Sequence, residues 1–347
     1  AVDYLDSVRE RPIWRDMPET VRASFSEPLP STGMASEAVY NEVLGRVFRY
    51  PMGNVHPRFW AWYMGAGNFT GALADFLAAV QGSNLGGGNH AAAFMELQVI
   101  DWCKEMVGFP QEASGILTSG GSMANMLALT IARNVYAGVD VRELGVAAME
   151  KPLRYYASNQ VHSCSRKSLE ALGLGNRALR LVDTDSDLRI DLGQLRHAIN
   201  EDREAGWKPA CIIASAGTVN TGAIDDLEAL AELAESEGLW LHVDGCIGAL
   251  LAIAPDNHHR VAGLKRAHSL AMDPHKWLHA PFEVGCMLVK DAAAHHGTFA
   301  VTPEYLEKTH RGIASANWLH ELGPVSYTHL TLPTICFKCR SRWWGER

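Results

Sequence analysis

The sequence of 347 residues lacks long apolar runs and long blocks of like charge. No apolar run reaches the roughly 20 residues that a membrane-spanning helix needs, and no basic region followed by an apolar segment stands at the start. Lys and Arg together number 31 against 39 Asp and Glu, so the net charge is −8. This balance gives no sign of binding to nucleic acid or to an anionic membrane. We therefore expect a cytoplasmic protein with a small-molecule partner.

Cysteine is scarce, and its distribution favours reduced thiols. The seven cysteines are Cys103, Cys164, Cys211, Cys246, Cys286, Cys336 and Cys339. Their number is odd, and most lie in apolar contexts, which is typical of core thiols. Cys336 and Cys339 form a CxxC pair, but without a second pair or histidines at ligand spacing it supports zinc only weakly. We expect no metal site.

Strand-like apolar runs alternate with helical patterns through the middle of the chain. The runs GILTS, LRYYAS, ALRLV and ACIIASA are each followed by a helical pattern, and LWLHVD is followed by a short apolar stretch. Such alternation is typical of βαβ units, in which helices cover both faces of a mostly parallel sheet. The length suits one large domain with appendages, and no internal repeat stands out. The sequence predicts an α/β fold.

A candidate nucleophile lies in the segment SLAMDPHKWLHAPFEVGCMLV, where Lys276 follows His275 between two strand-like runs. A nucleophilic lysine needs a neutral amine, and partial burial by Met272, Trp277 and Leu278 is expected to lower its pKa. An isolated His-Lys pair is more often a solvated surface pair. The residues upstream favour the nucleophile.

One of these upstream residues is Asp244, which ends the apolar run LWLHV. Ligands of open α/β sheets bind at the carboxyl ends of the strands, and an aspartate there can hold a protonated heteroaromatic nitrogen. A helix cap or a turn is the commoner role for such a residue.

A candidate anion cradle lies in GILTSGGSMANMLALTIARN, where Gly121 and Ser122 open a helical pattern. Glycine allows close backbone approach, and a helix start offers unpaired amides and a favourable dipole. The turn has neither Walker nor GxGxxG spacing, and an ordinary helix cap is an equally good interpretation. A lysine, an acid and an anion cradle are nevertheless the groups that pyridoxal phosphate (PLP) needs.

Five motifs carry a family resemblance. In chain order, TSGGSMAN, HSCSRKSLEALGLG, SAGTVNTGAIDDL, HVDGCIGA and DPHKWL resemble the motifs of the group II PLP-dependent amino-acid decarboxylases. This family includes the aromatic-amino-acid, glutamate, histidine and diaminobutyrate decarboxylases. The resemblance runs from about Pro51 to about Gly323. It implies a type I PLP fold with an aspartate aminotransferase-like large domain, a homodimer with active sites at the subunit interface, and decarboxylation of an L-amino acid to an amine.

The resemblance also implies roles for single residues. Lys276 resembles the lysine that forms the Schiff base with PLP, Asp244 the partner of the pyridinium nitrogen, and His162 the imidazole stacked on the cofactor ring; these three are the expected catalytic residues. A lone histidine outside such a motif is usually just hydrogen-bonded. The expected cofactor-binding residues are Gly121, Ser122, His162, Thr218, Asp244, Asp273, His275 and Lys276. The family often has a second hydroxyl beside Thr218, where this chain has Val219.

The substrate pocket is expected to include Trp62 and Tyr63 of HPRFWAWYMGAG, which suits an aromatic or apolar side chain. Packing at a dimer interface explains these aromatic residues equally well, and Asn89 and His90 offer polar contacts instead. The family usually carries a tyrosine on a mobile loop after the lysine strand. The corresponding segment, residues 307–324, has none, and Tyr305 lies just before it. An aldehyde synthase, which adds oxidative deamination to decarboxylation, and a noncatalytic PLP-binding fragment are therefore the alternatives.

The expected domain organisation has three parts. Residues 1–80 form an N-terminal arm with dimer contacts, and residues 81–324 form the PLP-binding large domain. From Val325 the sequence VSYTHLTLPT resembles the translated end of a sequencing adapter, so residues 325–347 are interpreted as a non-native tail. On this interpretation the small C-terminal domain of the family is largely missing.

Overall fold

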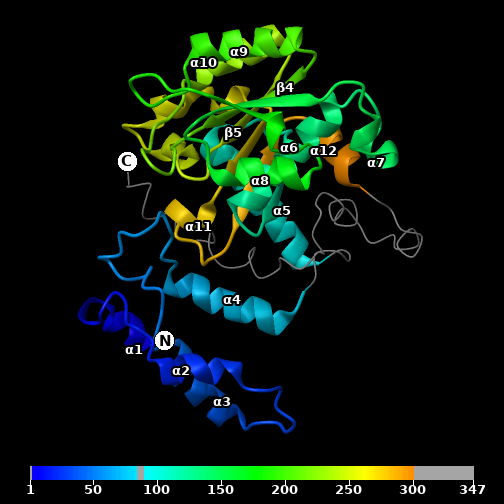
Figure 1. Ribbon diagram of the computed structural model, residues 1–347. Coiled ribbons are helices and arrows are strands. Elements are labelled where there is room, and N and C mark those ends of the chain that lie inside the picture. The colour runs from blue at the N-terminus through cyan, green and yellow to red at the C-terminus, as the bar shows by residue number, and fades with distance from the viewer. Residues whose placement is uncertain (1, 84–89, 301–347) are drawn as a thin grey trace. The chain divides into compact units, whose positions relative to one another are not determined.

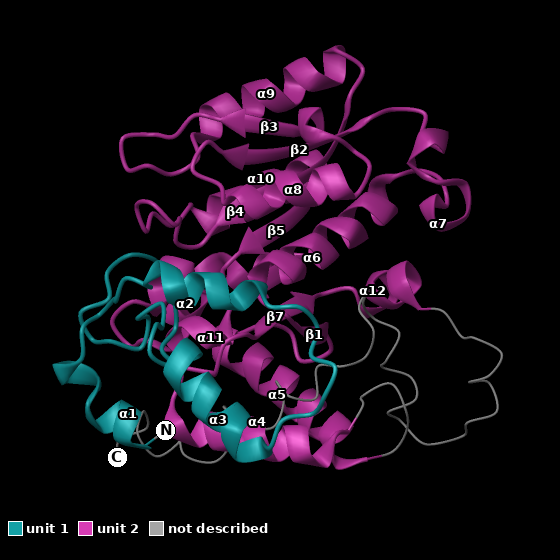
Figure 2. Ribbon diagram, turned by 60° about the horizontal axis from the view of Figure 1, so that its bottom comes forward, with its two compact units in different colours: residues 1–66 teal, residues 67–347 magenta. Residues whose placement is uncertain are grey.

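The computed structural model describes residues 2–83 and 90–300 (Figure 1). The chain forms two compact units, Ala1–Ala66 and Gly67–Arg347 (Figure 2). The expected limits of arm, large domain and tail stay predictions, and residues 325–347 lie outside the described residues.

The first unit is built from short helices with little core. Its α-helices are α1 (Val2–Asp6), α2 (Glu19–Ala23) and α3 (Ser36–Glu42), and a π-helical turn over Val43–Val47 continues α3. None of the described residues of these helices is buried. Val39, Val43 and Val47 are 45%, 41% and 52% exposed, so the described residues of this unit leave the apolar side of α3 and its extension uncovered.

The second unit contains a seven-stranded sheet among its described residues, in the order β1-β7-β6-β5-β4-β2-β3. The strands are β1 (Ser114–Thr118), β2 (Leu153–Ser158), β3 (Leu179–Val182), β4 (Lys208–Ser215), β5 (Trp240–Asp244), β6 (Ser269–Met272) and β7 (Gly285–Val289). β7 is antiparallel to both β1 and β6, whereas the other neighbouring pairs are parallel. The expected mostly parallel sheet is confirmed, and six strands have their carboxyl ends at one edge.

Helices cover both faces of this sheet, as expected. Those of the second unit are α4 (Phe69–Gln81), α5 (Ala91–Val107), α6 (Gly121–Tyr136), α7 (Val141–Leu144), α8 (Ser163–Ala171), α9 (Leu192–Glu204), α10 (Leu227–Glu237), α11 (Pro274–Trp277) and α12 (Ala292–Phe299). One core packs α5, α9 and α10 against the sheet, and a second core packs α6, α8 and α12.

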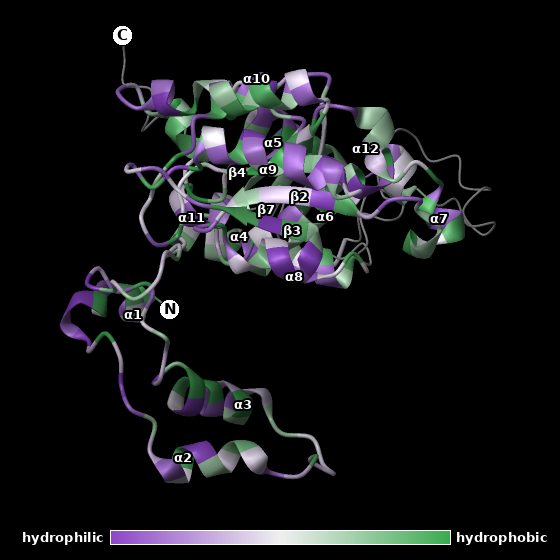
Figure 3. Cartoon of the chain, turned by 45° about the horizontal axis from the view of Figure 1, so that its top comes forward, coloured by the Kyte–Doolittle hydropathy of each residue, from purple (hydrophilic) through white to green (hydrophobic). Residues whose placement is uncertain are grey.

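Neighbouring strand residues alternate between these two cores. Leu270 contributes to the first core and Ala271 to the second, because successive side chains of a strand point to opposite faces. A strand that is buried on both faces has a continuous apolar sequence. In the hydropathy colouring β7 is accordingly green, whereas α8 carries purple hydrophilic residues (Figure 3). This is why GILTS and ACIIASA are recognisable as strands.

Local signals set the helix ends. The carboxylates of Asp191 and Asp226 accept hydrogen bonds from the backbone amides of Gln194 and Ala229, which caps the starts of α9 and α10. At the end of α10, Gly238 takes the left-handed conformation with φ +66°. In the described part of the chain no helix is both long and apolar enough to cross a membrane.

Candidate active site

The sheet topology gathers the predicted site residues at one edge. The turns after β1, β2, β4, β5 and β6 all leave the same edge, because these strands point the same way. Asp244 ends β5 and pairs in register with Ser215 of β4 and Ala271 of β6. These strand ends and the segments that follow them contain Gly121, His162, Thr218, Asp244, Asp273 and Lys276.

Lys276 lies in α11 beside a buried carboxylate. Its Nζ is 2.9 Å from Oδ2 of Asp273, and Nε2 of His275 is 3.7 Å from the same oxygen. Asp273 is only 4% exposed. Its other oxygen, Oδ1, is buried and has no hydrogen-bond partner among the described residues. The carboxylate is therefore held by the lysine on one side and can accept a further donor on the other.

This ion pair overturns the expected effect of burial on Lys276. Burial does act to lower the pKa of the amine, but the Asp273 carboxylate, with that of Asp244, outweighs it, and the pKa is raised above its ordinary value. The expectation of a lowered pKa was wrong, because apolar neighbours in the sequence do not reveal a carboxylate that folds back onto the amine. The lysine is a charged group that needs a proton acceptor before it can attack a carbonyl carbon.

His275 is held by contacts with the segment before β7. Its Nδ1 lies 2.7 Å from the carbonyl oxygen and 3.1 Å from the amide nitrogen of Val284, and its ring packs edge-on against Phe282 with centroids 4.9 Å apart. The imidazole is buried, with 6% exposure. It therefore anchors the turn that carries Lys276 to the segment that leads into β7.

The first turn of α6 packs tightly against Cys246 and Asp273. Gly120, with φ +109°, precedes the helix, and its carbonyl accepts the amides of Met123 and Ala124. A Cβ on Gly121 would overlap Sγ of Cys246 and lie 2.8 Å from Oδ2 of Asp273. Only glycine fits at this position, because any side chain would overlap its neighbours. The backbone amides of Gly121 and Ser122 precede the first hydrogen bonds of the helix.

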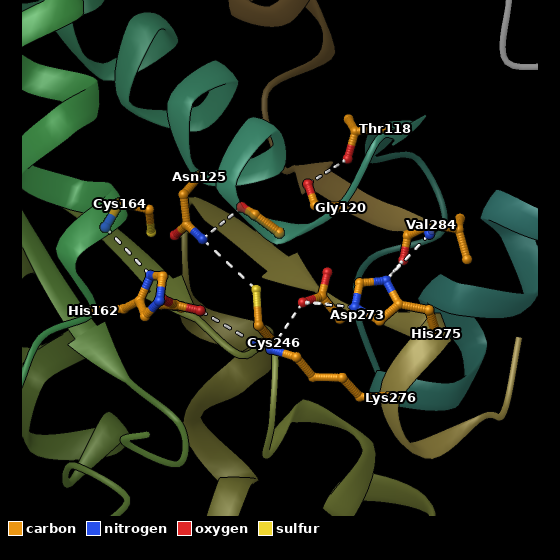
Figure 4. A network of polar contacts seen from close by, with 12 residues as sticks. Thr118, Gly120, Asn125, His162, Cys164, Cys246, Asp273, His275, Lys276 and Val284 are labelled. Atoms are coloured by element: carbon orange, nitrogen blue, oxygen red, sulfur yellow. Dashed lines mark hydrogen bonds and ion pairs between the residues drawn. The ribbon is translucent and has the colours of Figure 1, made fainter. Parts of the chain in front are cut away.

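Cys246 connects this turn with Asp244. Its amide donates to Oδ1 of Asp244 at 3.2 Å, and its Sγ lies 3.7 Å from Nδ2 of Asn125 (Figure 4). Burial, together with Asp244, raises the pKa of the Cys246 thiol well above its ordinary value. Cys164 behaves alike, with a pKa raised to about 12 chiefly by burial. Both thiols therefore stay protonated and serve as packing groups.

His162 and Thr218 lie in the turns after β2 and β4. His162 is exposed and caps α8, where its Nδ1 accepts the amide of Cys164 at 3.3 Å. The hydroxyl oxygen of Thr218 is 2.6 Å from that of Thr221, and Val219 is 51% exposed. The second hydroxyl near Thr218 thus comes from a residue three positions later. The contacts of both residues to a cofactor stay predictions.

The other predicted residues are exposed or have no described place at this edge. Ser122, the second residue of α6, is exposed. Trp62 and Tyr63 belong to the first unit and are 66% and 43% exposed, and their role in a substrate pocket stays a prediction. Asn89, Tyr305 and the segment 307–324 lie outside the described residues.

Sequence reasoning missed three polar residues beneath the site. Asn125, His242 and Ser269 are buried and hydrogen-bonded to one another in a row. The one signal in the sequence was a polar residue at a position where an apolar one is expected. Asn125 lies within TSGGSMAN, on a buried helix face, and His242 lies within LWLHVD, a buried strand.

Comparison with known proteins decides the family. A sequence model described as the pyridoxal-dependent decarboxylase conserved domain matches residues 18–322. The chain belongs to this family. An aromatic-L-amino-acid decarboxylase of Bacillus atrophaeus is 35% identical over 320 residues, which are 90% of this chain and 64% of that protein. The mouse aromatic-L-amino-acid decarboxylase is 28% identical, with 89% and 67% covered. The chain thus spans about two thirds of the length of these relatives.

Solved structures agree with this assignment. A TDC of Oryza sativa, solved with PLP and tryptamine, matches with a TM-score of 0.85 and 25% identity over 95% of this chain and 70% of that chain. The glutamate decarboxylase domain of a Vibrio parahaemolyticus protein matches with a TM-score of 0.79 and 26% identity, with 86% and 66% covered. The expected type I fold is confirmed.

The residues at the carboxyl edge fit PLP. Lys276 supplies a primary amine, Asp244 a strand-end carboxylate, and the first turn of α6 a set of backbone amides beside a glycine that has no room for a side chain. These are the chemical groups that such a cofactor requires.

Proposed function

We propose that this chain catalyses the PLP-dependent decarboxylation of an L-amino acid, preferably an aromatic one, to the corresponding amine and carbon dioxide. The observation that carries the proposal is the placement of Lys276, Asp244 and Gly121 at one sheet edge in a chain of this family. The names of the relatives from Bacillus atrophaeus and mouse support the aromatic substrate.

PLP, when bound, supplies an electron sink for the negative charge that develops at the substrate's α-carbon as the carboxylate leaves. Lys276 would hold the cofactor covalently, and the negative charge of Asp244 would keep the ring nitrogen protonated. The amides of Gly121 and Ser122 would hold the phosphate, and His162 and Thr218, from the turns after β2 and β4, would contact the cofactor.

The proposed role of Asp273 follows from its carboxylate. An anionic group repels a phosphate, so its contribution to the phosphate cradle is indirect, through its close packing against the first turn of α6. At 2.9 Å from Nζ of Lys276, it is also placed to accept the proton that the amine must lose before it reacts.

The proposal includes a cytoplasmic homodimer. The cysteines of the described residues are free thiols, four of them buried, which fits a reducing compartment. Leu73, Phe76, Leu77 and Val80 form an apolar stripe on α4 and are 50% to 70% exposed. Such a stripe on a helix surface fits a partner subunit.

The lysine assignment is tested by reducing the PLP-loaded protein with borohydride and mapping the labelled peptide. We expect the cofactor on Lys276 and unchanged labelling in a Lys290→Ala control. Cofactor on Lys265 or Lys290 in the wild-type protein would contradict the assignment.

The reaction type is tested by product analysis over a panel of amino acids. We expect carbon dioxide and amine in equal amounts, with the highest rate for aromatic substrates. Aldehyde, ammonia and oxygen consumption would point to the second candidate, an aldehyde synthase. Two observations favour that candidate: residues 307–324 contain no tyrosine, and a phenylacetaldehyde synthase of Arabidopsis thaliana is 27% identical over 88% of this chain. Cofactor binding without carbon dioxide release would leave the noncatalytic alternative.

A further inference from the structure

A row of buried hydrogen bonds runs beneath the candidate site, from the sheet to the first turn of α6. Nε1 of Trp240 donates to Oγ of Ser269 at 2.8 Å, and this oxygen lies 2.9 Å from Nδ1 of His242. Nε2 of His242 is 2.7 Å from Oδ1 of Asn125, and Nδ2 of Asn125 donates to the carbonyl of Gly121 at 2.8 Å. None of these side chains is more than 3% exposed.

The two ends of this row determine its direction. Asn125 must present its amide nitrogen to the Gly121 carbonyl, since a carbonyl only accepts, and its Oδ1 therefore faces His242 and needs a donor. Nε2 of His242 must carry that proton. Burial lowers the pKa of His242 to about 4, so the ring is neutral near pH 7 and Nδ1 is an acceptor. The Ser269 hydroxyl donates to Nδ1 and accepts from Trp240. Each group in the row then has one consistent role.

The row ends at a turn that has no room for a further side chain. Asn125 also lies 3.7 Å from Sγ of Cys246 through Nδ2, and Cys246 fills the space where a Cβ of Gly121 would be. The amide of Cys246 is in turn bonded to Asp244. Asn125 therefore connects the start of α6 with the turn that follows β5, and His242 holds Asn125 in the orientation that this connection needs.

We propose that His242, as its Nε2–H tautomer, is a positioning residue that orients Asn125 and so holds the first turn of α6 against Cys246 and Asp273. The residue is fully buried and acts through Asn125. Its effect is transmitted to the amides of Gly121 and Ser122, and the inference rests on the proposed function in assigning those amides to the cofactor phosphate.

The tautomer is tested on the cofactor-free protein, labelled with ¹⁵N in its histidines. Imidazole ¹⁵N shifts of His242, assigned by their loss in His242→Gln, should show a protonated Nε2 and an unprotonated Nδ1, unchanged from pH 6 to 8. A protonated Nδ1 or a charged ring over this range would overturn the proposal. This measurement needs no cofactor, so it stands even if the proposed function fails.

Two variants test the consequence. His242→Met and Asn125→Leu remove the hydrogen bonds at similar volume, and we expect each to raise the Kd for PLP at least tenfold, measured by absorbance of the lysine-bound cofactor in folded protein. His242→Gln keeps a side-chain N–H donor and should recover most of the affinity.

A matched control comes from the same helix. Thr130 is buried and donates to the carbonyl of Met126 at 2.7 Å, the same four-residue spacing as Asn125 and Gly121. Thr130→Val should lower the unfolding temperature but change the Kd for PLP less than twofold. Equal affinity in His242→Met and wild type, or an equal loss in Thr130→Val, would overturn the proposal.

A wild-type protein that binds no PLP would instead refute the proposed function. If neither His242→Met nor Asn125→Leu folds, the tautomer measurement decides.

Discussion

At the scale of single residues, the candidate site is governed by carboxylates near one amine. Asp273 is the nearer partner of Lys276, and Asp244 contributes from the end of β5. At such distances, with little solvent between the groups, the carboxylates favour the charged amine more than burial disfavours it. The amine is consequently held in place and favoured in its charged form.

Asp273→Asn should lower the pKa of Lys276. The variant removes the largest of the causes that raise this pKa, and burial, which acts in the opposite direction, then has more weight. Covalent attachment of PLP to the cofactor-free protein needs the neutral amine, so its rate should reach half-maximum at a lower pH than in wild type. A stopped-flow absorbance profile from pH 6 to 10 measures this midpoint, and an unchanged or higher midpoint would contradict the prediction.

Asp244→Asn should retain part of the PLP binding and lose most of the turnover. An amide cannot supply the negative charge that holds the ring nitrogen protonated, and loss of one preorganised electrostatic group reduces kcat by roughly 10²–10³-fold. Turnover and cofactor content are measured on the same preparation. Asp226→Asn, the same substitution at the cap of α10, serves as control and should leave turnover unchanged, because the amide oxygen of Asn still accepts the capping hydrogen bond. Near-normal turnover of Asp244→Asn would remove Asp244 from the mechanism.

At the scale of elements, α6 joins the core to the site. Its buried face packs Leu127, Ala128 and Ile131 on the sheet, while its first turn meets Cys246 and Asp273. Small residues at that turn allow the backbone itself to approach the site, which larger side chains would prevent. The helix is thereby positioned by packing along its length and by the hydrogen bonds of Asn125 at its start.

Gly121→Ala should impair both folding and cofactor binding. The added Cβ would overlap Cys246, and such overpacking typically costs about 1–3 kcal/mol. Gly297→Ala is the matched control, because nothing lies within 4 Å of its added Cβ and it lies within α12. There we expect unchanged or slightly higher stability, by about 0.5–1 kcal/mol. Chemical denaturation and PLP titration measure both effects, and equal behaviour of the two variants would refute the steric argument.

At the scale of the whole molecule, the second unit is a layered α/β structure with two cores and one functional edge. Both faces of the sheet are covered, so the carboxyl edge is where side chains from five strand ends can meet a ligand. Outside the cores, α4 exposes an apolar stripe at helical spacing, with Phe76 and Val80 at 63% and 70% exposure. This stripe is the basis for expecting self-association.

Phe76→Glu should shift the protein from dimer to monomer. A charge in the centre of an apolar contact must be desolvated without a partner, which disfavours association. Sedimentation at micromolar concentration should give twice the monomer mass for wild type and the monomer mass for the variant. Leu144→Glu, at a 58% exposed position of α7, should leave the dimer intact. A wild-type monomer, or a Phe76→Glu dimer of unchanged affinity, would contradict the proposed homodimer.

The sequence by itself determined the alternation of strands and helices, because burial on one or two faces leaves a local periodicity that can be read directly. It also singled out Lys276 between two strand-like runs, Asp244 at the end of a run and Gly121 at the start of a helical pattern. Only the tertiary structure placed β7 antiparallel between β1 and β6, brought Gly121 against Cys246 and Asp273, and raised the pKa of Lys276. The bond between His242 and Asn125 joins residues 117 positions apart. Contacts of that kind depend on how packed elements meet in space, and no local pattern of polarity contains that information.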